Sequence, residues 1–413
     1  MINMPSTESL QPHIAWAGGR KVPVFSGNTS MVKLDLLFNA GTACQPQLLC
    51  AGAANKLVTV ATSIMDAAAM AEFMDFRGVM VEPAISTTQS TLTFYFLRRH
   101  AEELLPVIAD MLCRPAFAES DFHVWQGKRR QELATIEQRT SHIARKMFYG
   151  ELFGLDHPLG RYAMTDDADR LMLDNVKGFW RQHYGLKQCD VVLAGCVDDD
   201  LVALAGTCFG AETDIVEPMG LPTPEPKEHN RRLVRQMDGA TQTSLRIGRV
   251  IPLRWDDPDY ARLMLLVTAL GGYFGSRLMQ NIREDKGYTY GINAQSQIFR
   301  GLIVFYITAD VAAGTADVAV KETFNELRRL REEPIGEEEL QLVKTVLTGD
   351  YLRSVDGVFE LSTRYCDMLG TGVDERLTDN IREAIKETTA VQLQELAQRL
   401  FGEEDMTVCL AGV

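Results

Sequence analysis

The sequence lacks the features that would place the protein in a membrane, on a nucleic acid or in a disulfide scaffold. No stretch approaches the roughly 20 apolar residues of a membrane span, and the N-terminus has no apolar core of signal-peptide length. The formal net charge of −14 offers no basic footprint for phosphate. The eight cysteines include no C-x-x-C pair. We therefore expect a cytoplasmic protein with no membrane or nucleic-acid partner, or a periplasmic one if a leader has been removed.

Residues for common hydrolytic chemistry are also scarce. The seven histidines are scattered, with no pair three to five residues apart, so no two of them can bind one metal from a single helical face. No G-x-S-x-G or comparable nucleophile elbow is present. A metal-independent hydrolase therefore finds no support in the sequence, and we expect this chain to bind no metal.

What the sequence does contain is an internal repeat. The strand-like segment CDVVLAGCV at 189–197 recurs as MTVCLAGV at 406–413, which places Gly195 and Gly412 217 positions apart. Two more pairs align at an offset near 211, namely TLTFYFL at 91–97 with GLIVFYIT at 301–308 and VKLDLLF at 32–38 with TSLRIGRV at 243–250. Several matches in one order predict one fold used twice.

The repeat defines the expected domains. Strand-like apolar runs alternate with helix-like runs in each half, which predicts an α+β protein of two pseudo-repeated domains. Each domain should be a mainly antiparallel sheet with helices packed on one face. We place the N-terminal domain at 1–217, a proline-rich linker at 218–236 and the C-terminal domain at 237–413.

The most specific string is LGGYFGSRLMQNIREDKGYTYGINAQ at 270–295. Its two leading glycines suit a tight turn or close packing, and a helix from Ser276 to Ile282 would bring Arg283 to its end. A turn at Lys286-Gly287 would then place Tyr290 on a strand, so that both side chains can reach a common surface. Arg and Tyr together can hold a carbonyl or a developing oxyanion, although an arginine at a helix end is also a common structural cap.

The string resembles the L-G-G-x-x-S-R-L…L-R-E-x-x-G-x-x-Y signature of insulinase/pitrilysin-type peptidases, notably small bacterial members that are similar to mitochondrial processing peptidase. FNAGTACQP, DHPLGRY and YGLKQCDVVLAGCV in the first half also match motifs of that family, so the resemblance covers nearly the whole chain. It implies a duplicated α+β architecture. It also implies that Arg283 and Tyr290 bind substrate near the scissile bond.

The same resemblance exposes a missing metal site. The family uses H-x-x-E-H on one helix, with a distal glutamate as third zinc ligand. Here the corresponding run is CAGAANKLVTVATSI at 50–64, and the three motif positions hold Asn55, Val58 and Thr59. Glu137 lies near the distal position, with Glu132 as the alternative. Without the other ligands, we interpret either glutamate as a solvated helix residue.

The pattern predicts a division of labour between chains. Where the family's halves are separate chains, one often carries H-x-x-E-H while the other contributes Arg and Tyr. We therefore expect a non-catalytic, substrate-binding subunit, inactive alone, that supplies Arg283 and Tyr290 to a homologous zinc-bearing partner in a heterodimer or larger peptidase complex. The zinc would lie in the partner, and the substrate would be a peptide. The alternative is a scaffold or peptide-binding protein similar to the core subunits of the respiratory cytochrome complex.

Overall fold

The computed structural model describes residues 10–186, 189–210, 220–223 and 232–412, and it contains two sheets with helices around them. In spatial order the first sheet consists of β1 His13–Ala17, β2 Arg20–Ser26, β6 Cys189–Gly195, β3 Met31–Phe38, β5 Ser90–Leu97 and β4 Met80–Ile85. The second consists of β7 Arg232–Gln236, β11 Thr407–Gly412, β8 Gln242–Ile251, β10 Leu302–Ala312 and β9 Thr289–Phe299. The predicted α+β class with two mainly antiparallel sheets is confirmed.

The two sheets have the same strand order once β1 is set aside. In both, one parallel pair, β2 with β6 or β7 with β11, is followed by antiparallel pairs. Leu34 of β3 lies opposite Leu193 of β6, and Leu245 of β8 lies opposite Leu410 of β11. These pairs reproduce the sequence offsets of 211 and 217. The internal repeat is therefore a structural repeat.

The matched glycines serve the same purpose in each half. Gly195 and Gly412 end their strands with φ of 98° and 140°, which L side chains rarely adopt. A Cβ on Gly195 would lie 2.2 Å from the carbonyl oxygen of Met31, and one on Gly412 would lie 2.3 Å from that of Gln242. Met31 and Gln242 are themselves 211 positions apart, so the same close backbone approach occurs twice.

One predicted match is out of register. Leu34 lies opposite Phe94 of β5, whereas Leu245 lies opposite Ala309 of β10. Phe94 and Ala309 are 215 positions apart, so the alignment of 91–97 with 301–308 is displaced by four residues. Because an even displacement keeps every side chain on its own face of the sheet, the apolar pattern could not reveal the error.

Each half also carries a matching series of helices. In the first half these are α1 Cys50–Leu57, α2 Ala67–Phe76, α3 Ala101–Cys113, α4 Glu119–Ile136, α5 Thr140–Phe153, α6 Thr165–Arg170, α7 Leu173–His183 and α8 Asp199–Phe209, with the 3-10 turn η2 Arg98–His100. In the second half they are α9 Pro258–Val267, the π-helical η4 Thr268–Gly272 and η5 Met279–Asp285, α10 Ala316–Glu332, α11 Glu337–Arg353, α12 Val358–Thr371, α13 Arg376–Glu387 and α14 Ala390–Leu400, with the 3-10 turn η6 Glu403–Asp405.

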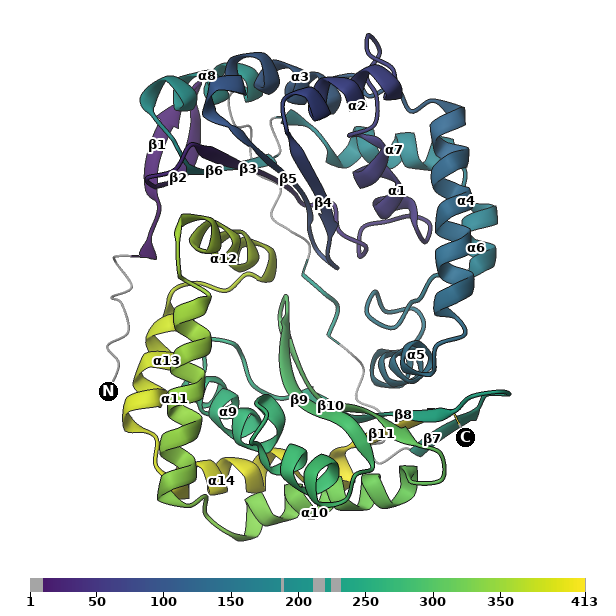
Figure 1. Ribbon diagram of the computed structural model, residues 1–413, viewed down its shortest axis with the longest axis vertical. Coiled ribbons are helices and arrows are strands. Elements are labelled where there is room, and N and C mark those ends of the chain that lie inside the picture. The colour runs from purple at the N-terminus through teal and green to yellow at the C-terminus, as the bar shows by residue number, and fades with distance from the viewer. Residues whose placement is uncertain (1–9, 187–188, 211–219, 224–231, 413) are drawn as a thin grey trace.

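The two halves exchange one helix each. Most helices cover the outer face of their own sheet and build its main core. Helix α5 of the first half instead packs on β8 and β11 of the second sheet, and α12 of the second half packs on β2, β3 and β6 of the first (Figure 1). Each sheet therefore has an inner face covered by the opposite half, which the sequence did not predict.

A buried ion pair fastens α12 to the first sheet. The Nζ atom of Lys33 lies 3.0 Å from a carboxylate oxygen of Asp35, and both side chains are almost fully buried. Lys33 also donates to the hydroxyls of Ser362 and Thr363 on α12, at 2.9 and 2.8 Å. Ser362 donates in turn to Asp35 at 2.8 Å. Every charge in this cluster has a partner, as burial requires.

The predicted linker ends in a strand. Residues 218–219 and 224–231 lie outside the described residues, and 220–223 have no regular structure. The last five, Arg232–Gln236, form β7 and pair with β11, so they belong to the second sheet. This edge strand is mostly exposed, which is why its sequence RLVRQ shows no clean apolar alternation.

None of the helices in the described residues combines the length and the apolar composition needed to cross a bilayer.

Candidate functional site

The segment that carries Arg283 and Tyr290 is a helix, a turn and the start of β9. Gly271 packs so closely on β9 that a Cβ there would lie 2.7 Å from the backbone nitrogen of Ala294. The predicted helix continues past Ile282 to Asp285 and is π-helical from Met279. Gly287, with φ of 64°, then turns the chain into β9. The helix–turn–strand order matches the prediction.

Arg283 is held by its own neighbourhood. The guanidinium carbon lies 4.3 Å from the centroid of the Phe274 ring, and one terminal nitrogen lies 3.3 Å from a carboxylate oxygen of Glu284. The side chain is 30% exposed, and the Phe274 ring is itself mostly exposed. A guanidinium stacked on one ring with its edge near solvent can still donate hydrogen bonds to an incoming oxygen.

Tyr290 projects fully into solvent. Its relative exposure is 99%, and its hydroxyl makes no hydrogen bond to any described residue. It stands at the start of β9, which is an edge strand of the second sheet. No contact joins the Tyr290 and Arg283 side chains within the described residues, so the structure presents two separate donors, of which the phenol is unused.

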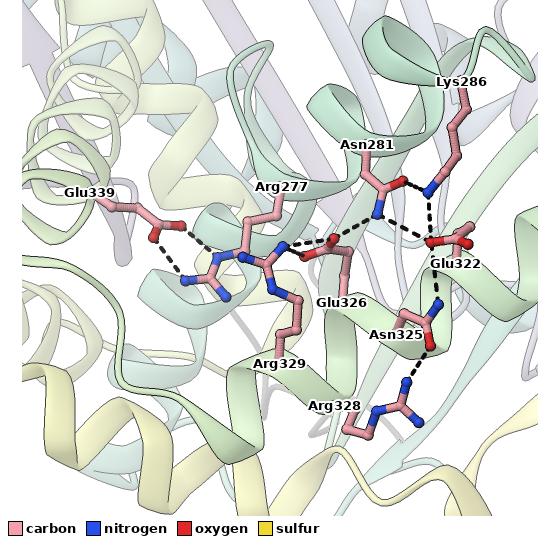
Figure 2. Close-up of polar contacts among 9 residues, drawn as sticks. All are labelled: Arg277, Asn281, Lys286, Glu322, Asn325, Glu326, Arg328, Arg329 and Glu339. Atoms are coloured by element: carbon pink, nitrogen blue, oxygen red, sulfur yellow. Dashed lines mark hydrogen bonds and ion pairs between the residues drawn. The ribbon is translucent and has the colours of Figure 1, made fainter.

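A network of polar side chains joins the helix that bears Arg283 to helices α10 and α11 (Figure 2). Arg277 makes a bidentate contact to Glu339 of α11, at 2.7 and 2.8 Å. Asn281 donates to the buried Glu326 of α10 at 2.6 Å. These charge-assisted bonds join the 277–286 segment to two long helices and thereby fix the backbone on which Arg283 stands.

The turn itself is tied to α10 by Lys286. Its ammonium group donates to the Asn281 side chain at 2.6 Å and lies 2.7 Å from a carboxylate oxygen of Glu322. The hydrogen bond from Lys286 holds the pKa of Glu322 below its usual value. The ion pair is therefore complete at neutral pH and weakens only as the pH falls through that lowered pKa.

The positions of the family's H-x-x-E-H motif are occupied by structural residues. Asn55 is buried, donates to the carbonyl of Ala84 in β4 at 2.8 Å, and accepts from the hydroxyl of Tyr184 at 3.1 Å. Val58 is fully buried, and the Thr59 hydroxyl donates to the carbonyl of Lys56. These groups hold α1 to its neighbours and offer no ligand set for zinc.

Helix α1 is also shorter than expected. The resemblance implies a helix that extends through positions 55–59, but α1 ends at Leu57. The β-branched residues that follow, Val58, Thr59 and Val60, disfavour helix continuation. Two of the three motif positions therefore lie beyond the helix, whereas the zinc motif needs both of its histidines on one helical face.

Glu137 has a structural role that the sequence did not reveal. The sequence predicts a solvated helix residue, but the Glu137 carboxylate accepts hydrogen bonds from the backbone N–H and, at 2.8 Å, from the hydroxyl of Thr165 at the start of α6. The alternative, Glu132, forms an ion pair with Arg129 on the surface of α4. Within the described ranges, no group of three or more His, Cys, Asp or Glu side chains could hold a metal ion.

Zinc analysis tests this description of the degenerate site. The purified chain is expected to hold no stoichiometric zinc at positions 55–59, because an amide, an isopropyl group and a hydroxyl replace the two imidazoles and the carboxylate. Elemental analysis after extensive dialysis provides the measurement. About one tightly held zinc per chain, lost on substitution within 55–59, would show that the site is intact.

Comparisons with known proteins agree with this fold and site. A family model described as "Peptidase M16 inactive domain" matches residues 170–347, a range that contains Arg283 and Tyr290 but not positions 55–59. The uncharacterized zinc protease YmxG of Bacillus subtilis is 25% identical over 353 residues, which cover 83% of each chain.

Two solved structures share the fold. A peptidase M16 inactive domain from Pseudomonas fluorescens is 20% identical with a TM-score of 0.82, and the alignment covers 96% of this chain and 97% of that one. A chain of complex III2 from Candida albicans is 14% identical with a TM-score of 0.75, covering 96% and 94%. This chain therefore shares the fold of both structures, and its positions 55, 58 and 59 hold no histidine or glutamate. The resemblance to the insulinase/pitrilysin-type peptidases is confirmed, because this chain is similar to the M16 inactive domain and to bacterial proteins named zinc proteases.

Proposed function

We propose that this chain is the non-catalytic, substrate-binding subunit of a zinc-dependent peptidase complex. It would supply Arg283 and Tyr290 to the active site of a homologous partner chain that carries H-x-x-E-H and hydrolyses peptides. The observation that carries the proposal is the contrast between the two sites. The metal positions are filled by packing residues, whereas Tyr290 keeps a fully exposed, unbonded hydroxyl on a segment braced by ion pairs.

The chemistry of the two donors fits this role. Zinc bound in the partner would activate water for attack on a peptide carbonyl, and negative charge would then develop on the carbonyl oxygen. Arg283 can donate charged N–H groups to that oxygen, and Tyr290 can donate a neutral O–H. A braced backbone lowers the cost of holding such donors in place, which is what oxyanion stabilisation requires.

A second candidate is a scaffold or peptide-binding protein without a part in catalysis. The observation that favours it is the shared fold with a chain of Candida albicans complex III2, at a TM-score of 0.75. The two candidates differ in what Arg283 and Tyr290 do. A scaffold would tolerate their replacement, whereas a catalytic complex would lose turnover.

Co-purification tests the proposed partnership. The tagged chain should be co-expressed with the H-x-x-E-H protein of similar size from a neighbouring reading frame, and the mixture analysed by size-exclusion chromatography with metal analysis. We expect one complex with about one zinc for each partner chain and none for this chain. Separate elution of the two proteins, or the absence of any such neighbouring frame, would favour the scaffold.

A further inference from the structure

A cavity of about 710 Å³ lies between α5 and the second sheet. The cavity is lined by the start of α5 and by β8, β9 and β10, and it adjoins Met279 and Gly291, next to the elements that carry Arg283 and Tyr290. Its volume is typical of ligand pockets. We propose that this cavity binds a carboxylate group of a peptide through the guanidinium of Arg246.

The charges that line the cavity are unbalanced. Three arginines line it, namely Arg139, Arg145 and Arg246, against the one carboxylate of Asp310. Asp310 already accepts a hydrogen bond from the hydroxyl of Ser244. His142 also lines the cavity, and burial together with the nearby Arg145 lowers its pKa, so it adds little charge at neutral pH. The excess of positive charge favours an anion.

Arg246 is the buried member of this set. Its relative exposure is 8%, and its Nε atom is buried without a hydrogen-bond partner. Within the described residues its guanidinium makes no hydrogen bond and no ion pair. Three aromatic rings surround it instead, with centroids 4.2 Å away for Tyr306, 5.2 Å for Tyr149 and 5.5 Å for Phe148.

A buried arginine without a hydrogen-bonding or charged partner lowers the stability of the folded protein. The guanidinium cannot lose its proton at physiological pH, so it remains a buried charge even though burial lowers its pKa. Contacts with the aromatic ring faces offset part of the free energy that the guanidinium loses when it leaves water. They do not provide hydrogen-bond acceptors for its N–H groups. A carboxylate that entered the cavity would provide two acceptor oxygens in the planar geometry that a guanidinium recognises.

The internal repeat supplies an independent comparison. Asp35 in β3 and Arg246 in β8 are 211 positions apart, and the β3–β6 and β8–β11 registers make them equivalent. In the first half the buried charge of Asp35 is neutralised by Lys33. In the second half the residue equivalent to Lys33 is Ser244, which leaves Arg246 without a counter-charge. The buried charge at this fold position is therefore neutralised within the protein in the first half, whereas in the second half it can bind an anion.

The choice of a peptide carboxylate rests on the proposed peptide-binding function, because the cavity adjoins the Arg283 and Tyr290 segment. The carboxylate could come from a peptide C-terminus or from an acidic side chain, which share one chemistry. An inorganic phosphate could satisfy the same arginines. The experiment therefore compares all three sources on the full-length chain.

The test uses three fluorescent peptides built on one parent sequence that contains no acidic residue: the free C-terminal acid, the C-terminal amide, and the amide with one residue replaced by glutamate. We expect wild-type protein to bind the peptides with a carboxylate at least about tenfold more tightly than the plain amide. Arg246→Gln should remove this preference, and Arg246→Lys should reduce it because the bidentate geometry is lost. Arg249→Gln, which alters an arginine of the same strand already paired with Asp405, should retain it.

Thermal unfolding adds a readout that separates this role from a structural one. Arg246→Gln should leave the melting temperature unchanged or raise it, because an uncompensated buried charge is removed, whereas Arg249→Gln should lower it. Equal binding of the acid and amide peptides by wild-type protein would overturn the inference while leaving peptide binding intact. Binding of no peptide would overturn the proposed function as well. Loss of the preference at millimolar phosphate with tight phosphate binding would assign the cavity to phosphate instead.

Discussion

Replacing Arg283 with alanine, or Tyr290 with phenylalanine, is expected to cut peptide turnover by the reconstituted complex by roughly ten- to a thousandfold. Each change removes one donor from the oxygen on which charge develops, and such a donor contributes about 2–4 kcal/mol to lowering the barrier. Folding and association should remain nearly intact, because Arg283 contacts only its local neighbours and Tyr290 bonds to no described residue. Steady-state kinetics with a fluorogenic peptide give the measurement.

Two substitutions on neighbouring surfaces serve as controls. Arg328→Ala removes an exposed arginine of α10, and Tyr288→Phe removes a phenol two residues before Tyr290. Both should leave turnover within about twofold of wild type, since Arg328 bonds to Asn325 on α10 and Tyr288 packs against the core of the second half. If the Arg283 and Tyr290 variants instead support wild-type rates, the pair is a relic of ancestry and the scaffold becomes the better description.

Replacing Lys33 with methionine is expected to lower the free energy of unfolding by about 3–5 kcal/mol. The change leaves Asp35 buried without its counter-charge and removes the hydrogen bonds that Lys33 donates to Phe359, Ser362 and Thr363 of α12. Because α12 comes from the opposite half, the loss should also loosen the contact between the halves. Urea denaturation monitored by circular dichroism measures the effect.

A double variant separates the charge effect from the loss of contacts. Lys33→Met combined with Asp35→Leu removes both charges and should recover most of the stability, because an apolar pair of similar volume often replaces a buried ion pair at little cost. A single variant within 1 kcal/mol of wild type, or a double variant less stable than the single one, would contradict the assigned role of the pair.

The repeat could be predicted because it is written in local patterns. The strands around Gly195 and Gly412 keep the same apolar alternation and the same closing glycine, which the backbone geometry demands. The exchange of α5 and α12 could not be predicted in the same way. An amphipathic helix shows that one face is buried, but its pattern is the same whichever sheet covers that face.

In the candidate site, too, the features with a local sequence signal could be predicted, and those that depend on long-range contacts could not. The turn at Gly287 and the strand start near Tyr290 follow from local signals, so the helix–turn–strand order could be predicted. The bracing by Glu322, Glu326 and Glu339 joins residues more than 35 positions apart and has no local signal. Arg246 was overlooked although a charge within the apolar strand TSLRIGRV is itself a signal. Recognising it required the repeat to be used residue by residue.

The measurement that tests the central claim most directly is the rate at which the zinc-bearing partner cleaves a peptide with and without this chain. Neither protein alone should turn over substrate at an appreciable rate, and an equimolar mixture should raise turnover at least tenfold, because the metal and the Arg283–Tyr290 donors then meet at one scissile bond. A partner that cleaves equally fast by itself would contradict the account, since this chain would then contribute nothing to catalysis.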